Sequence, residues 1–148
     1  MSKAVQALLS GMFFTFILDF FLFLGVKENY IDKLEINLYY NILFADNQSL
    51  FLFLFFSVLI GYVTLYLSNK TSIIVVGTLF LLASATLIPP IGFSVGEAMF
   101  TQKNKTIHTQ RFSYTGDIYY IGRKEIYIHD YKLDRMLKIE KNKIKEIH

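Results

Sequence analysis

Two acidic side chains, Asp19 and Glu97, lie in parts of this chain where a carboxylate is unusual. Both belong to long apolar stretches, and an ionised carboxylate inside a membrane costs about 2.5–3.5 kcal/mol even on lenient insertion scales. Such a pair can carry protons or cations, or it can bind a basic group of a partner protein. The structural alternative is that Thr15 or a serine hydrogen-bonds Asp19 within a helix bundle, while Glu97 lies among lipid headgroups.

The remaining polar residues do not assemble into a catalytic or metal-binding pattern. The 148-residue chain has no Cys, which excludes disulfides, cysteine-ligated metals and a cysteine nucleophile. The three histidines lack the spacing of a helical metal site, and His108 and His129 would meet only if their strands paired in one register. Asp117, Asp130 and Asp134 fall in expected turns, which acidic residues favour for local hydrogen bonding. We therefore predict no metal, no cofactor, no catalytic residue and no enzymatic activity.

Three apolar runs dominate the sequence. Hydrophobic residues make up 53% of the chain, the mean hydropathy is +0.40, and the runs cover residues 4–26, 50–67 and 73–100. A helix needs roughly 20 apolar residues to cross a bilayer, so we predict three membrane spans. Pro89 and Pro90 remove two amide donors and are expected to break the third span.

Each predicted span carries a row of small or polar residues at helical spacing, which permits close approach of another helix. We predict that these residues contact a partner or each other within the bundle, together with the two carboxylates. The residues are Ala7, Gly11, Thr15 and Asp19 in the first span, Ser57 and Gly61 in the second, and Gly92, Gly96 and Glu97 in the third.

The segment between the first two spans, residues 31–45, has apolar residues at helical spacing on one face. It is expected either to lie as a helix on the membrane surface or to be an ordinary short connecting helix. The positions of Lys and Arg near the span ends predict an outside N-terminus and a cytoplasmic C-terminus, because this orientation places more of these cations inside. The cations inside are then Lys27, Lys33, Lys103, Lys105 and Arg111, and those outside are Lys3 and Lys70.

Residues 101–148 change to a period of two and carry 11 Lys or Arg against 6 Asp or Glu, which leaves 11 − 6 = +5. The alternation predicts four short antiparallel strands, folded as a meander or an SH3-like barrel. Residues 143–148 fit either a fifth strand or a terminal helix. Turns are expected at residues 115–117, 122–123, 130–134 and 141–142.

Aromatic residues alternate with basic ones in this tail domain. A sheet of this kind can stack single-stranded bases, but no RNA-binding signature is present and we do not expect a nucleic-acid partner. A basic domain attached to a membrane more economically faces anionic headgroups. The simplest alternative is a small barrel with aromatic side chains in its core and solvated lysines outside. The basic surface is predicted at Lys103, Lys105, Arg111, Arg123 and Lys124.

The whole chain is predicted to be an α+β membrane protein, with a three-helix transmembrane bundle in residues 1–100 and a small antiparallel β domain in residues 101–148. Frequent Lys, Asn, Ile and Phe without Trp or Cys are typical of an AT-rich bacterial genome, so the expected location is the inner membrane. A β domain of this size barely buries enough apolar surface to fold alone. We therefore expect a non-enzymatic accessory protein that binds, stabilises or helps to assemble a larger membrane complex, or that self-associates. The alternatives are an ion- or proton-translocating oligomer that uses Asp19 and Glu97, and a membrane-anchored sensor whose tail binds anionic lipid or nucleic acid.

Overall fold

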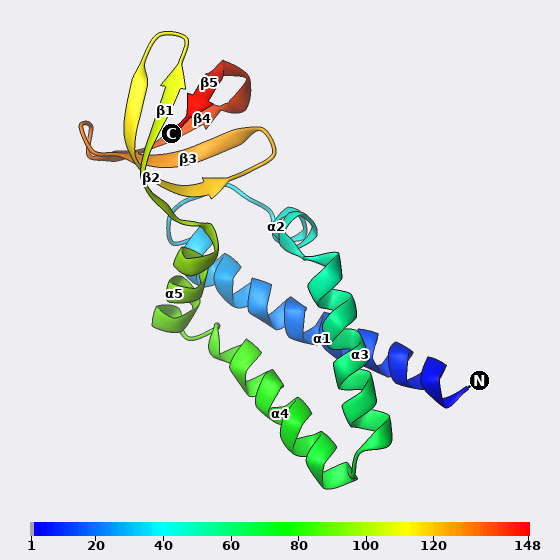
Figure 1. The fold of residues 1–148 in the computed structure, drawn as a ribbon. Helices are drawn as coiled ribbons and strands as arrows, with labels where there is room; N and C mark the ends of the chain where they lie inside the picture. Colours follow the sequence, from blue (N-terminus) through cyan, green and yellow to red (C-terminus); the bar gives the residue numbers. More distant parts are fainter. Residues whose placement is uncertain (1) are drawn as a thin grey trace. The chain divides into compact units, whose positions relative to one another are not determined.

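The computed structural model describes residues 2–148 and has an α+β architecture, with five α-helices followed by a five-stranded antiparallel sheet (Figure 1). The α+β class and the antiparallel sheet predicted from the sequence are thereby confirmed. The chain divides into two compact units, a helical unit that ends at Phe93 and a sheet unit that covers Ser94–His148.

The first helix, α1 (Lys3–Val26), begins where the hydroxyl of Ser2 accepts a hydrogen bond from the Val5 amide. It continues as a π-helical turn, Lys27–Ile31. The combined helix is the one described helix that is long and apolar enough to cross a membrane by itself.

The helix considered for residues 31–45 is not continuous. The chain turns after the π-helical segment, and Glu35 has φ = 56°, a backbone conformation that an α-helix cannot contain. A shorter helix, α2 (Tyr40–Asn47), follows this turn. The apolar residues at this spacing therefore do not share one helix, since Ile31 ends the π-helical turn and Ile42 lies in α2, which is a short connecting helix.

The next two helices, α3 (Leu50–Tyr66) and α4 (Asn69–Ala85), each start at a serine cap. Each has 17 residues, which at about 1.5 Å per residue is roughly 25 Å long. The axis bends by 83° between α2 and α3 and by 88° between α4 and α5 (Pro89–Phe100). The second and third predicted spans therefore reach the length of a membrane crossing only as bent pairs.

The predicted break near the double proline is present, but it lies just before the prolines. Residues 86–88 form the break, and Pro89 and Pro90 are the first two residues of α5. The first amides of a helix have no intrahelical acceptor, so proline loses no hydrogen bond at this position.

The sheet has the strand order β4-β3-β2-β1-β5, and all of its pairs are antiparallel. Four strands form a meander, and the last strand returns to pair with the first. Residues 143–148 therefore contribute a strand and not a terminal helix. The strands are β1 (Gln102–Thr109), β2 (Ser113–Ile121), β3 (Glu125–Asp130), β4 (Arg135–Glu140) and β5 (Ile144–Ile147), with a 3-10 turn at Lys141–Lys143 before β5.

The turn predicted at residues 115–117 is wrong, because these residues lie inside β2 and the chain reverses at residues 110–112. Gly116 pairs with Asp130 on the neighbouring strand, and a Cβ at this glycine would lie 1.8 Å from the carbonyl oxygen of His129. Glycine is present here so that two strands can approach closely and not so that the chain can turn.

The sheet unit has its own apolar core, which is built from β-branched side chains that favour strands. Tyr114, Leu137 and Ile144 pack against it. The core residues are Ile107, Ile118, Ile126, Ile128 and Ile139.

Candidate functional site

The small residues of the first two predicted spans meet each other within the chain. A Cβ at Gly11 would lie 1.7 Å from the carbonyl oxygen of Ser57, and a Cβ at Gly61 would lie 2.1 Å from the carbonyl oxygen of Ala7. The backbones of α1 and α3 are therefore in direct contact, side by side as in Figure 1. These four residues form an internal helix contact and are not available to a partner.

Asp19 is held by a residue that the sequence did not single out. Its Oδ2 accepts a hydrogen bond of 2.8 Å from the side-chain amide of Gln48, at the junction of α2 and α3. Thr15, the donor expected from the sequence, is buried, and its hydroxyl has no hydrogen-bond partner among residues 2–148. The hydroxyl of Tyr40 donates to the carbonyl of Phe20 beside this site. Asp19 thus anchors the end of α2 to α1.

The break between α4 and α5 frees backbone carbonyls, and a side-chain amide satisfies them. Asn29 donates through Nδ2 to the carbonyls of Thr86, at 2.9 Å, and Leu87, at 3.2 Å. Buried carbonyls freed by a break in a helix need such a donor, because an unpaired buried polar group costs free energy. The double proline predicted the break, but no spacing in the sequence indicated that Asn29 would donate hydrogen bonds to its carbonyls.

Two glycines make room for this contact. A Cβ at Gly25 would lie 2.1 Å from the hydroxyl oxygen of Thr86, and a Cβ at Gly92 would lie 2.1 Å from the Thr86 carbonyl oxygen. The Thr86 hydroxyl itself donates to the carbonyls of Ala83 and Phe21. Gly92, which the sequence predicted as a partner contact, therefore packs within its own chain.

Glu97 has an ion pair of its own within the sheet unit. Its carboxylate lies 3.4 Å from the ammonium of Lys103, and both side chains are largely exposed, at 43% and 67%. Gly96, one residue earlier, is buried. Asp19 and Glu97 belong to different units, and each has a separate partner within its own unit.

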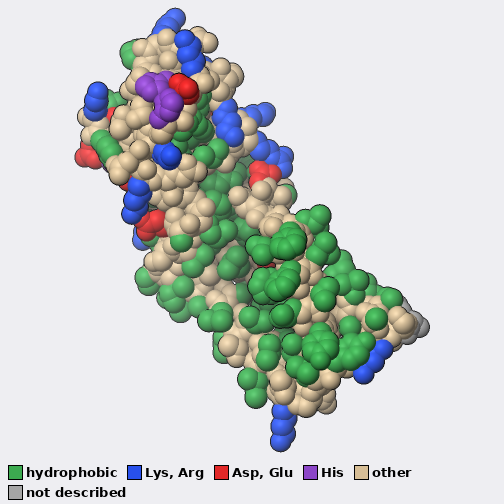
Figure 2. All heavy atoms as spheres, viewed as in Figure 1, with side chains coloured by type: hydrophobic (Ala, Val, Ile, Leu, Met, Phe, Trp, Pro, Cys, Tyr) green, Lys and Arg blue, Asp and Glu red, His purple; other side chains and the backbone are tan. Residues whose placement is uncertain are grey.

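The outer face of α4 is apolar and exposed, as is much of the surface of α3. Ile73 and Leu81 are each 73% exposed, and a Cβ at Gly77 would have nothing within 4 Å. Hydrophobic side chains likewise cover the helices on the face shown in Figure 2, whereas most of the Lys and Arg side chains visible there lie over the sheet. The side chain of Ser72 donates to the carbonyl of Val63, which ties the start of α4 to α3.

The predicted basic residues of the tail lie at separate places on the sheet unit. Lys103 and Lys105 are in β1, Arg111 is in the turn between β1 and β2, and Arg123 and Lys124 are in the turn between β2 and β3. These two turns line two neighbouring grooves.

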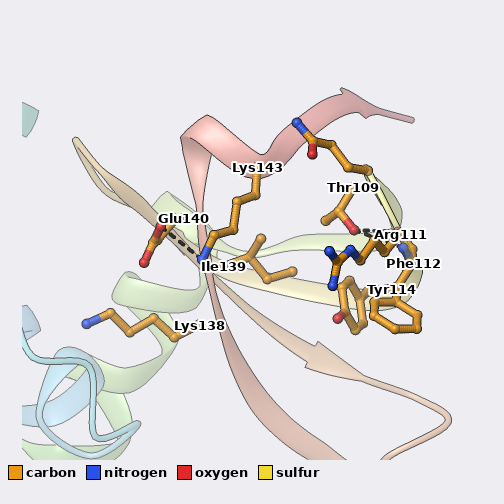
Figure 3. Close-up of a pocket in the computed structure, with 9 residues that line it drawn as sticks. Thr109, Arg111, Phe112, Tyr114, Lys138, Ile139, Glu140 and Lys143 are labelled. Carbon is orange, nitrogen blue, oxygen red and sulfur yellow. Dashed lines mark hydrogen bonds and ion pairs between the residues drawn. The ribbon is translucent and has the colours of Figure 1, made fainter.

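The first groove, of about 480 Å³, is drawn in Figure 3. Arg111, Phe112 and Tyr114 lie together at one end, and Lys138 and Glu140 lie toward the other. The second groove, of about 420 Å³, shares Glu140 with the first. Its other lining residues are Arg123, Lys124, Glu125, Lys141 and Asn142.

Both acidic residues of the grooves are already paired. Lys138 lies 2.9 Å from Glu125, and this contact raises the pKa of the Lys138 ammonium. Lys143 lies 3.1 Å from Glu140, and its hydrogen bond lowers the pKa of the Glu140 carboxyl. The sequence did not single out either lysine, because only the return of β4 and the 3-10 turn brings them into the groove that Arg111 lines.

A hydrogen-bonded cluster surrounds Asp117 at the irregular start of β1. The backbone amide of Asn104, whose φ is 54°, donates to the carboxylate at 2.9 Å, and the hydroxyl of Tyr131 donates to it at 2.5 Å. The Tyr131 hydrogen bond is the main cause of a lowered pKa at Asp117, and the same bond raises the pKa of Tyr131. Asp117 therefore holds a bulge in place and is not the turn residue expected from the sequence.

The pairing of His108 with His129 that the sequence left open is not present, because their strands β1 and β3 are not neighbours. His108 packs against His148, with 5.7 Å between the ring centroids, because β5 and not β3 is the neighbour of β1. Among residues 2–148 no three His, Asp or Glu side chains are grouped so that they could hold a metal ion. Asp130 accepts hydrogen bonds from the amides of Lys132 and Leu133 in the turn after β3, as an acidic turn residue does.

No protein-family model, curated protein or solved structure matches this chain. Its function is therefore inferred from its own surfaces. Two of them are suited to binding, the outer face of α4 and the basic grooves of the sheet unit.

Proposed function

We propose that the protein is an integral inner-membrane protein with three spans, which are α1, the bent pair α2–α3 and the bent pair α4–α5. In this arrangement the N-terminus lies outside and the sheet unit lies in the cytoplasm. At the end of the bundle where α1 starts, the ammonium of Lys3 lies 4.6 Å from the ring centroid of Tyr66, which stacks on Tyr62. Tyrosine and lysine side chains at one end of a bundle are typical of the membrane–water interface.

Labelling of single cysteines tests this topology cleanly, because the natural chain contains no Cys. An impermeant maleimide added to intact spheroplasts is expected to label Lys70→Cys, in the first turn of α4. It is expected to label Lys132→Cys, in the sheet unit, only after the cells are opened. Labelling of Lys132→Cys but not of Lys70→Cys in intact cells would show the opposite orientation. Labelling of both positions in intact cells would contradict a cytoplasmic sheet unit.

Within the membrane, we propose a non-enzymatic accessory role, in which the protein binds a larger membrane complex and stabilises it or helps to assemble it. The outer face of α4 carries this proposal. Apolar side chains gain nothing by leaving lipid, so helices associate in membranes where small residues let their backbones approach closely. The glycines of α1 and α3 are already used inside the chain, whereas Gly77 is open to an approaching helix.

Purification of the tagged full chain in mild detergent tests the role of this face. Gly77→Leu is expected to lower the amount of co-purified complex several-fold without changing the amount of inserted protein. Val58→Leu is the matched control, because Val58 on α3 is also exposed and the substitution also adds volume. Equal recovery of the complex with both variants would contradict the proposed contact. If the purified particle contains only copies of this chain, the partner at this face is a second copy and not a foreign protein.

A further inference from the structure

The two grooves of the sheet unit form one continuous surface, which we call the basic edge. It contains six of the eleven Lys and Arg residues of residues 101–148 but only two of the six acidic residues. The net charge of the basic edge is therefore 6 − 2 = +4, out of +5 for the whole segment. Its cations are Arg111, Arg123, Lys124, Lys138, Lys141 and Lys143, and its acids are Glu125 and Glu140.

The two acids of the basic edge neutralise the charge of particular lysines and not that of Arg111. Each of them is engaged by a neighbouring lysine, Glu125 by Lys138 and Glu140 by Lys143. Arg111 is exposed in the hairpin turn, with no acidic residue among its neighbours along the chain. In the first groove the charge of Arg111 therefore has no acidic partner among residues 2–148, whereas Lys138 and Lys143 are paired with Glu125 and Glu140.

An exposed phenylalanine lies beside this charge. Phe112 follows Arg111 in the hairpin turn and is 63% exposed. The turn itself is held by Thr109, whose hydroxyl accepts from the Phe112 amide at 3.1 Å and donates to the Phe112 carbonyl at 2.8 Å. A fixed turn that presents an aromatic ring next to cations combines apolar insertion with attraction to anionic lipid.

The chain connection limits what this surface can meet. The helix α5 ends at Phe100 and β1 begins at Gln102, so one residue separates the helical segment from the sheet. If the helices are in the bilayer, as proposed above, the sheet unit cannot move far from the headgroups. We propose that the basic edge docks on anionic phospholipid headgroups, with Phe112 inserted at the boundary of the acyl chains.

A single tryptophan reports on this docking, because the natural chain has none. The full chain with Phe112→Trp is reconstituted into nanodiscs of phosphatidylcholine alone, or of phosphatidylcholine mixed with phosphatidylglycerol. The emission of the tryptophan is expected to shift to the blue, and to be quenched by brominated lipid, only in the discs that contain phosphatidylglycerol. Rising salt concentration is expected to reverse both effects, since the interaction is largely electrostatic.

Charge variants in the same background test the basic edge itself. Each basic residue near an anionic surface contributes roughly fivefold to binding, so Arg111→Gln with Lys143→Gln should shift the docking equilibrium about 25-fold. Lys132→Gln removes one charge in the turn after β3, outside both grooves, and should have a smaller effect than either groove substitution alone.

Three results would overturn the docking proposal. The first is equal emission in both kinds of nanodisc, and the second is an equal effect of Lys132→Gln and Arg111→Gln. The third is a tryptophan response to a single-stranded oligonucleotide in phosphatidylcholine discs that phosphatidylglycerol does not produce. Failure of the chain to enter nanodiscs at all would instead contradict the proposed membrane topology, so the two failures are distinguishable.

Discussion

In the helical unit two glycines pack against backbone and many large apolar side chains are exposed, whereas in the sheet unit isoleucines fill the interior and lysines lie outside. Gly11 and Gly61 are in contact with backbone atoms, while Phe51 and Leu81 are mostly exposed. In the sheet unit the five core isoleucines are buried and every lysine of β4 and the 3-10 turn is exposed. The comparison teaches that the two units are held together differently. Close backbone contact joins α1 and α3, as suits the apolar medium proposed above, whereas the sheet unit removes apolar surface from water.

The largest effect is expected from filling the helix contact. In Gly11→Leu the new side chain would collide with the backbone at Ser57, which cannot move as a side-chain tip can. The loss of stability should reach or exceed the roughly 1–3 kcal/mol that is typical of overpacked sites. Thermal unfolding in detergent, followed by circular dichroism at the helix signal, measures this loss.

Gly77→Leu is the control for that experiment, because no atom lies within 4 Å of a Cβ at this position. Its melting temperature should equal that of the natural protein or exceed it, since glycine costs about 0.5–1 kcal/mol relative to alanine inside a helix. Equal losses in the two variants would mean that α1 and α3 are not packed backbone to backbone.

A comparable substitution in the sheet unit sharpens the contrast. Gly116→Ala would place a Cβ 1.8 Å from a carbonyl oxygen of the neighbouring strand, so β2 and β3 must separate locally. We expect amide hydrogen exchange to accelerate in the sheet unit and to remain unchanged in α1. Gly122→Ala, with its nearest backbone atom at 3.2 Å, is the milder control. Faster exchange in both units would show that they unfold together.

A smaller effect is expected at the break between α4 and α5. Asn29→Leu leaves the carbonyls of Thr86 and Leu87 without their side-chain donor, and an unsatisfied buried polar group costs about 1–3 kcal/mol. Limited proteolysis should then cut near residues 86–88 faster than in the natural protein. Asn29→Gln, which retains the amide on a longer chain, should recover part of the protection. No change in cleavage with either variant would contradict a structural role for Asn29.

The smallest effect is expected from the Asp117 cluster, which lies at the surface of the sheet unit. Because the pKa of Asp117 is lowered in the fold, chiefly by Tyr131, its hydrogen bonds stabilise the sheet above the ordinary carboxyl pKa. This contribution is lost as the pH falls through the lowered pKa. Tyr131→Phe should therefore speed amide exchange in β1 at about pH 6 and matter less at about pH 3, after correction for intrinsic exchange rates. If Tyr131→Phe speeds amide exchange in β1 equally at both pH values, the charged carboxylate of Asp117 is excluded as the cause.

The sequence was informative where the structure depends on local periodicity. The run at residues 50–67 matches α3 (Leu50–Tyr66) because an uninterrupted apolar run after a serine cap leaves little choice of conformation. The alternation in residues 106–147 predicted an antiparallel sheet for the same reason. Gly116 was misread because a turn and a close strand contact both favour glycine, and only the partner strand distinguishes them.

Contacts between distant residues could not be predicted in this way. Asn29 and Thr86 are 57 residues apart, and neither lies in a repeating pattern. Gln48 likewise has no feature that marks it as the donor to Asp19, which is 29 residues away. The small residues of α1 and α3 were recognised, but the sequence did not show that they contact one another while Gly77 of α4 stays open.

The mass of the particle extracted by mild detergent tests the central claim most directly. That claim is that a self-packed α1–α3 pair leaves α4 free to contact another membrane protein. Native mass spectrometry of the tagged full chain is expected to show a complex with at least one foreign membrane protein, and that complex should be depleted by Gly77→Leu. A well-folded solitary monomer, unchanged by the substitution, would contradict the account.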